Sequence, residues 1–154
     1  IGLPGHFFDM VGFRTPDDVV YLADCLSSVE TLDKYRIGFI YDIAAYLQTL
    51  EKVIGMEAAV FVLSHAAATE DVKELCRYNI AVVHEIAERI KEFCAGGIST
   101  EVLLQRLFKY YGLSMNMGQH VLVGSTVRSY LTWMKDRGEL DFYFEDEMLK
   151  WKTV

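Results

Sequence analysis

The sequence has few of the residues that mark disulfide-stapled or membrane-spanning proteins. Of its 154 residues only three are cysteines and two are prolines, and it contains no run of about 18 apolar residues. Cys25, Cys76 and Cys94 lie too far apart for a zinc knuckle or a Cys-x-x-Cys redox pair. We therefore expect no disulfide framework and no transmembrane helix. The sparse, odd cysteine count is typical of a reducing, cytoplasmic compartment.

Positive charge is also scarce. The chain has 15 Lys and Arg against 22 Asp and Glu, a net charge of −7. The whole excess lies in residues 1–97, while residues 98–154 are neutral. This balance argues against general binding to nucleic acid or to an anionic membrane. Hydrophobic residues make up 52% of the chain, so we expect either an extensive core or an apolar partner surface.

Two short apolar runs near the start predict a β-hairpin. The runs are His6–Phe13 and Val19–Ala23, and between them Thr15–Asp18 has Pro followed by Asp, the order that a type I turn prefers. A His and an Asp then lie at strand ends, His6 before the first strand and Asp24 after the second. A rigid sheet can aim both side chains at one point, so we expect a metal or catalytic site there.

The following residues predict an alternation of helices and one further strand. Apolar spacing predicts an amphipathic helix over Tyr41–Ile54 and a buried strand over Ala58–Leu63. A long helix should follow, capped by Thr69 and ending before Gly96, with Asn79 in its apolar seam as hydrogen-bonded core, register device or seam edge. Strand, helix and strand in this order imply a crossover connection with helices covering a sheet.

The last third of the chain predicts a small helical domain. We expect a short helix at 30–35 earlier in the chain and, after a hinge at Gly96 and Gly97, helices at 99–111, 117–123 and 126–137. A terminal hairpin follows, with strands Leu140–Phe144 and Met148–Trp151. Three helices and a hairpin resemble a winged-helix domain.

Three short motifs resemble the later metal-ligand motifs of the metallo-β-lactamase-fold hydrolases. They are Pro4-Gly5-His6, Leu22-Ala23-Asp24, and an apolar strand that ends in Ser64-His65. The resemblance implies that His6 completes the histidines of a first metal, that Asp24 bridges two metals, and that His65 binds the second. Taken singly, each has an ordinary alternative: a half-buried turn residue, a loop or cap carboxylate, and a strand-end side chain.

The resemblance implies an α/β fold, the C-terminal half of a four-layer αββα metallo-β-lactamase-like sandwich over residues 1–97. A small winged-helix-like domain over 98–154 would follow it. The family's His-x-His-x-Asp-His motif should lie upstream of His6, where only five residues stand. The chain also begins with Ile inside an expected strand, with no visible signal peptide, and we expect it to be a truncated fragment.

The implied activity is that of a metal-dependent hydrolase. In the intact family site two ions hold a bridging hydroxide that attacks an ester, thioester, lactam, lactone or phosphodiester. His and Asp ligands suit zinc, and also iron or manganese. With half of the ligands absent, we expect this chain to bind metal weakly or not at all and to contain no complete catalytic set. The fold alone does not choose among the substrates.

Half of a sandwich would expose the sheet face that should pack on the other half. The expected partner is therefore the missing N-terminal half, or a second copy of the chain in a homodimer. The alternative is a non-catalytic interaction or dimerisation module. Nucleic-acid binding through residues 98–154 is the less favoured form of this module, because acidic residues surround the predicted hairpin turn at 145–147.

Four other side chains have ordinary interpretations. Asp9 is expected to be exposed, and Cys25 to be a buried structural thiol near any metal. His84 falls on the polar side of the long helix, and His120 has no partner residue types nearby in the sequence. We expect both histidines to be surface or satisfied core residues.

Overall fold

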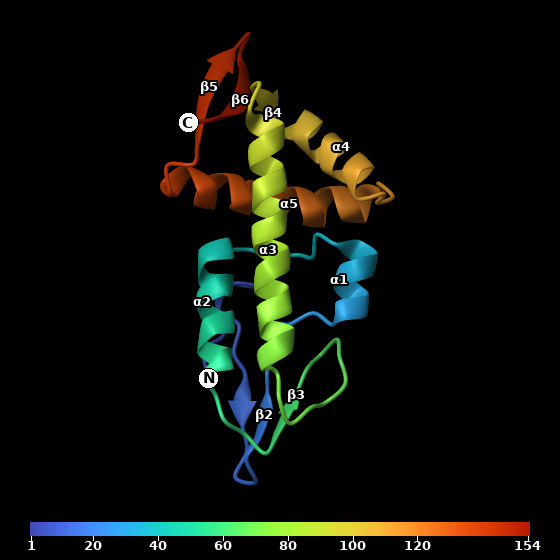
Figure 1. Cartoon of the computed structure of the whole chain (residues 1–154), viewed down its shortest axis with the longest axis vertical. Helices are drawn as coiled ribbons and strands as arrows, with labels where there is room; N and C mark the ends of the chain where they lie inside the picture. Colours follow the sequence, from blue (N-terminus) through green and yellow to red (C-terminus); the bar gives the residue numbers. More distant parts are fainter.

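A computed structural model describes all residues, 1–154. Helix α3 (Lys73–Cys94) runs along the long axis of an elongated molecule, and two small sheets lie at its opposite ends (Figure 1). The buried side chains form one hydrophobic cluster that continues from the first sheet to the second. None of the helices is both long enough and apolar enough to cross a membrane.

The first sheet has three strands in the order β1-β2-β3. Strand β1 (Phe13–Arg14) is antiparallel to β2 (Val19–Tyr21), and β2 is parallel to β3 (Val60–Val62). The predicted hairpin and the predicted crossover are therefore confirmed. Val20 pairs with Phe61, and both are buried, which places one face of the sheet against the helices.

The expectation of a strand from His6 onward is wrong. The chain reverses direction between Leu3 and Met10, whose N–H and carbonyl join at 2.8 Å, and β1 begins only at Phe13. Gly5 starts this turn with a φ of +124°, and a Cβ at Gly5 would lie 2.3 Å from the backbone of Tyr46. Only glycine fits both conditions. His6 is consequently held in a turn that packs against a helix, not at a strand end.

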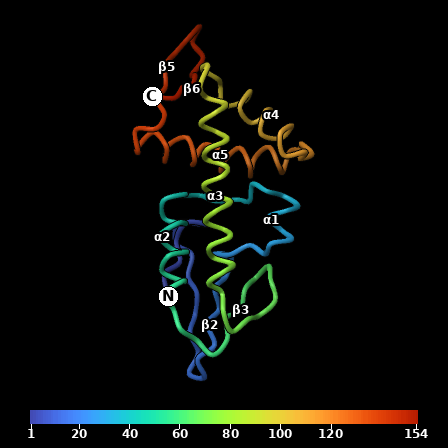
Figure 2. The backbone as a smooth tube through the Cα atoms, in the orientation of Figure 1, coloured from blue at the N-terminus to red at the C-terminus, as the bar shows by residue number.

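Helices α1 (Val29–Tyr35) and α2 (Ile43–Ile54) follow the prediction closely. The Asp42 side chain caps α2 by accepting a hydrogen bond from the N–H of Ala45 at 2.9 Å. Figure 2 shows the connection between α1 and α2 running beside helix α5 (Met117–Asp136), far away in the sequence.

Thr69 does not cap α3 as predicted. Its backbone instead exchanges both hydrogen bonds with Phe61, at 2.7 and 3.0 Å, so that it adds a bridge to the edge of β3. The helix begins at Lys73, whose N–H donates to Asp71 Oδ1 at 2.9 Å. The competing backbone pairing explains why a good capping residue lies outside the helix.

The predicted break at Gly124 is also absent, because 117–136 form the single helix α5. Gly124 lies inside this helix, and a Cβ there would contact Leu104 of helix α4 (Thr100–Tyr110) at 3.6 Å. Gly124 is therefore a buried residue of a continuous helix beside α4, and it forms no turn. The cap of α4 is Ser99, whose side chain accepts a hydrogen bond from the N–H of Val102.

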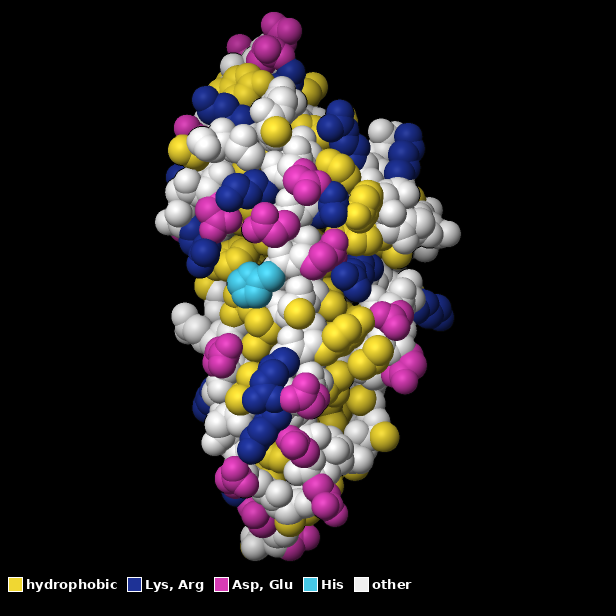
Figure 3. All heavy atoms as spheres, in the orientation of Figure 1, with side chains coloured by type: hydrophobic (Ala, Val, Ile, Leu, Met, Phe, Trp, Pro, Cys, Tyr) yellow, Lys and Arg dark blue, Asp and Glu magenta, His cyan; other side chains and the backbone are white.

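The second sheet has the order β4-β6-β5 and is antiparallel throughout. It contains the expected hairpin, β5 (Leu140–Glu145) and β6 (Met148–Thr153), and a short strand that was not predicted, β4 (Ile98–Ser99). Acidic side chains gather at the hairpin tip (Figure 3). The winged-helix comparison and the domain boundary at residue 97 stay predictions.

Candidate metal centre

The structure brings His6, Asp24 and His65 together at the surface. The Nε2 atom of His65 lies 3.2 Å from Asp24 Oδ1, and the Nε2 atom of His6 lies 4.0 Å from Asp24 Oδ2. Each carboxylate oxygen thus faces a different imidazole. The three residues predicted to share a site do meet, whereas their role as metal ligands stays a prediction.

The sheet explains why Asp24 and His65 meet. They follow β2 and β3, which are parallel, so both strands end at the same edge of the sheet. Two backbone hydrogen bonds hold the two strand ends together, from Leu22 N–H to the Val62 carbonyl at 2.9 Å and from Ser64 N–H to the Ala23 carbonyl at 3.3 Å. His6 joins this edge from the turn built on Gly5.

His6 is the most enclosed of the three side chains. It is 28% exposed, against 40% for Asp24 and 63% for His65. Its ring meets Phe39 edge to face, with the centroids 5.4 Å apart. Burial lowers the pKa of His6, and the nearby Asp24 carboxylate only partly opposes this effect. The imidazole is therefore favoured in the neutral form, which has a lone pair available for a metal ion.

The donor atoms fit part of a metal centre. Two imidazole nitrogens around a shared carboxylate form a ligand set that suits zinc, iron or manganese. However, no group of three or more His, Cys, Asp or Glu side chains is arranged to hold one ion. With Asp24 shared, each of two ions would receive only two ligands from this chain. Further ligands would have to come from elsewhere.

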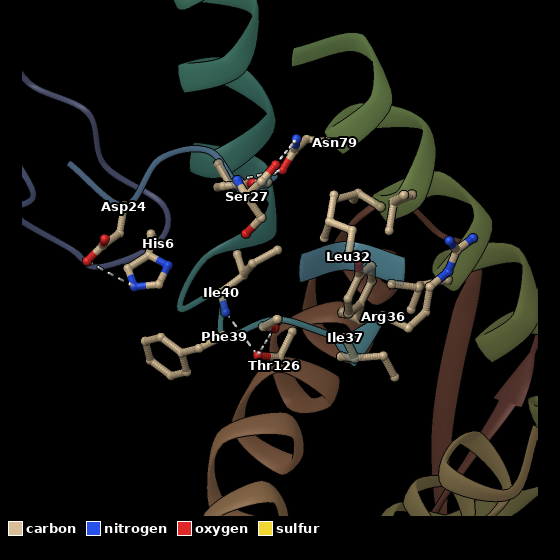
Figure 4. Close-up of a pocket in the computed structure, with 16 residues that line it drawn as sticks. His6, Asp24, Ser27, Leu32, Arg36, Ile37, Phe39, Ile40, Asn79 and Thr126 are labelled. Atoms are coloured by element: carbon tan, nitrogen blue, oxygen red, sulfur yellow. Dashed lines mark hydrogen bonds and ion pairs between the residues drawn. The ribbon is translucent and has the colours of Figure 1, made fainter. Parts of the chain in front are cut away.

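A cavity extends inward from His6 and Asp24, between α1, α2, α3 and α5. Figure 4 shows the two site residues on one side of it and Leu32, Arg36 and Ile37 on the other. Most of its walls are aliphatic side chains: Leu32, Ile37, Ile40, Val82, Val83 and Ile86. The candidate site therefore combines a polar mouth with a mainly apolar interior.

Asn79 ties the wall of this cavity to α3. Its Oδ1 accepts from the Ser27 N–H at 3.1 Å and from the Tyr46 hydroxyl at 3.0 Å, and its Nδ2 donates to the carbonyls of Ser27 at 2.9 Å and Leu75 at 2.8 Å. All four hydrogen bonds of the amide are thereby made. Of the roles left open by the sequence, Asn79 has that of hydrogen-bonded core, and it fixes the segment that follows Asp24.

Helix α5 holds the other side of the cavity. Thr126 Oγ1 accepts from the Ile40 N–H at 2.9 Å, and Ser129 Oγ accepts from the Ile43 N–H at 3.1 Å. These bonds fasten the connection between α1 and α2, which carries Phe39 against His6. A helix from the last third of the chain is in this way part of the site, a contribution that no local sequence signal indicated.

Tyr130 is the residue of the site that sequence reasoning missed most clearly. It lines the cavity from α5 and is completely buried, and its hydroxyl makes no hydrogen bond. Burial raises the pKa of its phenol well above the ordinary value. In the sequence it is one inner-face residue of an amphipathic helix. The only available signal was a polar atom in an otherwise apolar seam.

The remaining singled-out residues match their ordinary interpretations. Asp9 is exposed and Cys25 is buried. His84 is an exposed residue beside the ring of Trp133, and His120 is a half-buried residue 4.0 Å from Glu101. Neither histidine belongs to the cluster around Asp24.

Two solved structures share the architecture described above. A metallo-β-lactamase family protein from Thermus thermophilus superposes with a TM-score of 0.78 at 14% identity, over 100% of this chain and 48% of its own. A β-lactamase domain protein from Burkholderia ambifaria gives a TM-score of 0.77 at 15% identity, over 98% of this chain and 46% of its own.

The chain thus spans about half the length of these proteins. No protein-family model matches the sequence, and neither does any curated protein. The structural likeness alone confirms the fold that the three motifs predicted. The chain has the metallo-β-lactamase fold over about half of its usual length, in agreement with a C-terminal half.

Proposed function

We propose that this chain is the C-terminal half of a metal-dependent hydrolase and supplies three ligands to a two-ion centre. The observation that carries the proposal is the position of the Asp24 carboxylate. One of its oxygens faces His65 and the other faces His6, at 3.2 and 4.0 Å. A bridging carboxylate between two ions, each also bound by one imidazole, would use the same arrangement.

In this proposal His6 and Asp24 bind one ion, and Asp24 and His65 bind the other. Zinc is the expected metal from the nitrogen and oxygen donors, with iron or manganese as alternatives. Such ions lower the pKa of water towards neutrality and polarise the bond that is to be cleaved. The substrate would be a small molecule with an ester, thioester, lactam, lactone or phosphodiester bond.

The chain by itself should be inactive, because it lacks the other ligands. The comparison structures are about twice as long, which agrees with a complete site that needs an upstream half. That half would bring the His-x-His-x-Asp-His motif implied by the resemblance. We therefore assign the three ligands to this chain and the rest of the catalytic set to its partner.

The outer face of the first sheet is the surface proposed for that partner. Val11, Phe13 and Tyr21 on this face are 50%, 65% and 45% exposed. Together with Ala23, Val62 and Leu63 they line a shallow hollow. Leaving apolar surface in water is unfavourable by about 25 cal/mol per Å². The proposed occupant is the upstream half, and a second copy of the chain is the alternative occupant.

A non-catalytic interaction module is the competing function, and this same apolar face favours it. Nucleic-acid binding through the last third of the chain has less support. Its exposed hairpin turn contains Glu145, Asp146 and Glu147, which would repel phosphates. Of its basic residues, Arg128 is paired with Glu101 at 3.1 Å.

Zinc titration of the chain and two variants tests the proposal. We expect weak binding by the wild type, at least tenfold weaker binding by Asp24→Asn, and unchanged binding by His84→Gln, whose imidazole lies outside the cluster. Equal affinity of the wild type and Asp24→Asn would show that Asp24 is not a ligand. Stoichiometric, tightly held zinc on the isolated chain would contradict the incomplete site.

Intact mass under denaturing conditions complements the titration. A single species near 17.6 kDa identifies the chain alone, so its lack of turnover is expected. A second co-purifying fragment would identify the partner directly. In that case ester and phosphodiester hydrolysis by the complex, with added zinc, becomes the decisive assay, and inactivity of the zinc-loaded complex would favour the interaction module.

A further inference from the structure

The buried hydroxyl of Tyr130 is the least satisfied feature of the cavity. Tyr130 is completely buried, and its hydroxyl oxygen has no hydrogen-bond partner. Buried polar atoms in native proteins almost always have a partner, so an exception points to something that is bound there. Its position on a cavity wall makes a ligand the natural candidate.

Asn79, Thr126 and Arg36, three other polar residues on the cavity walls, are already paired. The Asn79 amide makes all four of its hydrogen bonds, and Thr126 accepts from Ile40. On the far wall, the Arg36 guanidinium donates from Nε and Nη2 to Glu85, at 3.2 and 2.8 Å. His6, Asp24 and Ser27 also line the cavity, so its polar side can meet a charged or polar group. The Tyr130 hydroxyl is the one completely buried hydrogen-bonding group on its walls that has no partner.

We propose that this cavity binds a short, mainly apolar and uncharged segment of the substrate, and that the Tyr130 hydroxyl donates a hydrogen bond to one acceptor atom on it. The aliphatic walls favour apolar atoms and make an unpaired charge unfavourable. Because burial holds the pKa of Tyr130 far above neutrality, the phenol keeps its proton and acts as the donor.

The location gives this segment its role. The cavity opens beside His6 and Asp24 (Figure 4), so a molecule whose scissile bond lies at the metal centre would extend its chain towards Tyr130. This role rests on the proposed hydrolase function. The binding of a small apolar molecule by the cavity does not, since it needs no metal.

The cavity has a volume of about 50 Å³, so the test uses the 154-residue chain without metal and acetonitrile as the probe, a small molecule with a methyl group and one acceptor nitrogen. Binding is followed by chemical-shift titration. We expect saturable binding to the wild type and about tenfold weaker binding to Tyr130→Phe, a loss equal to about 1.4 kcal/mol. The Phe variant keeps the ring that fills the core. Tyr110→Phe changes an exposed tyrosine and should bind as the wild type does.

A second variant tests the location. Val83→Ile adds one methylene to a cavity wall and should weaken binding several-fold without unfolding the protein. Equal binding by the wild type and Tyr130→Phe overturns the proposal, and so does the absence of saturable binding, which would leave ordered water as the partner of the hydroxyl. Zinc binding is measured separately, so a failed metal centre and an unoccupied cavity give different results.

Discussion

The two sheets at the ends of α3 are built in different ways. The first has strands of only two or three residues and leaves its outer face apolar and exposed, yet it carries Asp24 and His65 at one edge. The second consists mainly of two six-residue strands paired along their whole length. The β5–β6 pair is stabilised by its own continuous backbone pairing. The candidate site instead depends on side chains from the helices, chiefly Asn79 and Thr126.

Replacing Asn79 should therefore have the largest effect. The Asn79→Ala variant leaves the buried Tyr46 hydroxyl and the Ser27 backbone without their partners, and we expect it to lower the free energy of unfolding by about 3 kcal/mol. Urea denaturation measures this loss. Gln48→Ala removes an amide from the exposed side of α2 and should change the stability by less than about 0.5 kcal/mol. Equal effects of the two variants would disprove the dependence on Asn79.

Removing the hydrogen bond between α5 and the segment that joins α1 to α2 should have the next largest effect on stability. Thr126→Val keeps the side-chain shape but leaves the Ile40 N–H unpaired, with an expected loss of about 2 kcal/mol in unfolding free energy. Amide hydrogen exchange at Ile40 should accelerate at the same time. Thr132→Val is the matched control, because Thr132 is exposed on α5 and bonds only to carbonyls of its own helix. Unchanged exchange at Ile40 would contradict the prediction.

Two buried thiols report separately on the two ends of α3. Cys76 lies near the first sheet and Cys94 near the second, and burial raises the pKa of each thiol to about 12. At pH 8 neither should react with iodoacetamide until the structure opens. We expect Cys76 to be alkylated about tenfold faster than Cys94, because its end has the shorter strands. Peptide mass spectrometry would measure both rates, and equal rates would remove the contrast between the two ends.

The same two thiols determine the direction in which the free energy of unfolding changes with pH above pH 9. In the unfolded chain they ionise near pH 9, whereas in the folded protein they stay protonated up to about pH 12. The unfolded state therefore binds fewer protons in this window, and the free energy of unfolding should fall as the pH rises from 9 to 12. Urea denaturation of the wild type and of Cys94→Ala at a series of pH values would measure how much the Cys94 thiol contributes to this fall in the free energy of unfolding.

The smallest effect on stability is expected at the bare sheet face. Tyr21→Lys should leave the free energy of unfolding within about 0.5 kcal/mol of the wild type, because Tyr21 is 45% exposed. It should nevertheless weaken association through that face, either with the upstream half or with a second copy. Sedimentation velocity at micromolar concentrations would show this change. Tyr35→Lys replaces an exposed tyrosine on α1 and should leave association as it is.

Local patterns predicted the elements that local forces decide. The type I turn at Thr15–Asp18 predicted the hairpin, and the apolar spacing of α2 and β3 predicted the crossover helix and the strand that follows it. The meeting of Asp24 and His65 then follows from parallel strands. The predicted hairpin also joined His6 to Asp24, although a turn and not a strand end holds His6 there, and the resemblance added His65.

The errors arose where tertiary contacts decide the local structure. The residues from His6 onward looked like a strand, but the close approach of α2 to Gly5 requires a turn there. Gly124 looked like a break, but it packs against α4 within a continuous helix. Thr69 looked like a helix cap, but its backbone forms two hydrogen bonds with Phe61 at the edge of β3. The role of Tyr130 could not be predicted, because a cavity exists only after four helices have packed.

The place of α5 in the cavity wall has a consequence for how this protein could change. The residues proposed to meet the metal lie between positions 6 and 65, whereas Thr126 and Tyr130 shape the opposite wall. In the proposed function, the metal ligands and this part of the cavity wall are therefore encoded in separate stretches of the chain. Substitutions at Tyr130 would change the shape of the cavity and leave the three proposed ligands in place, whereas Thr126 has to stay because it fastens the segment that carries Phe39.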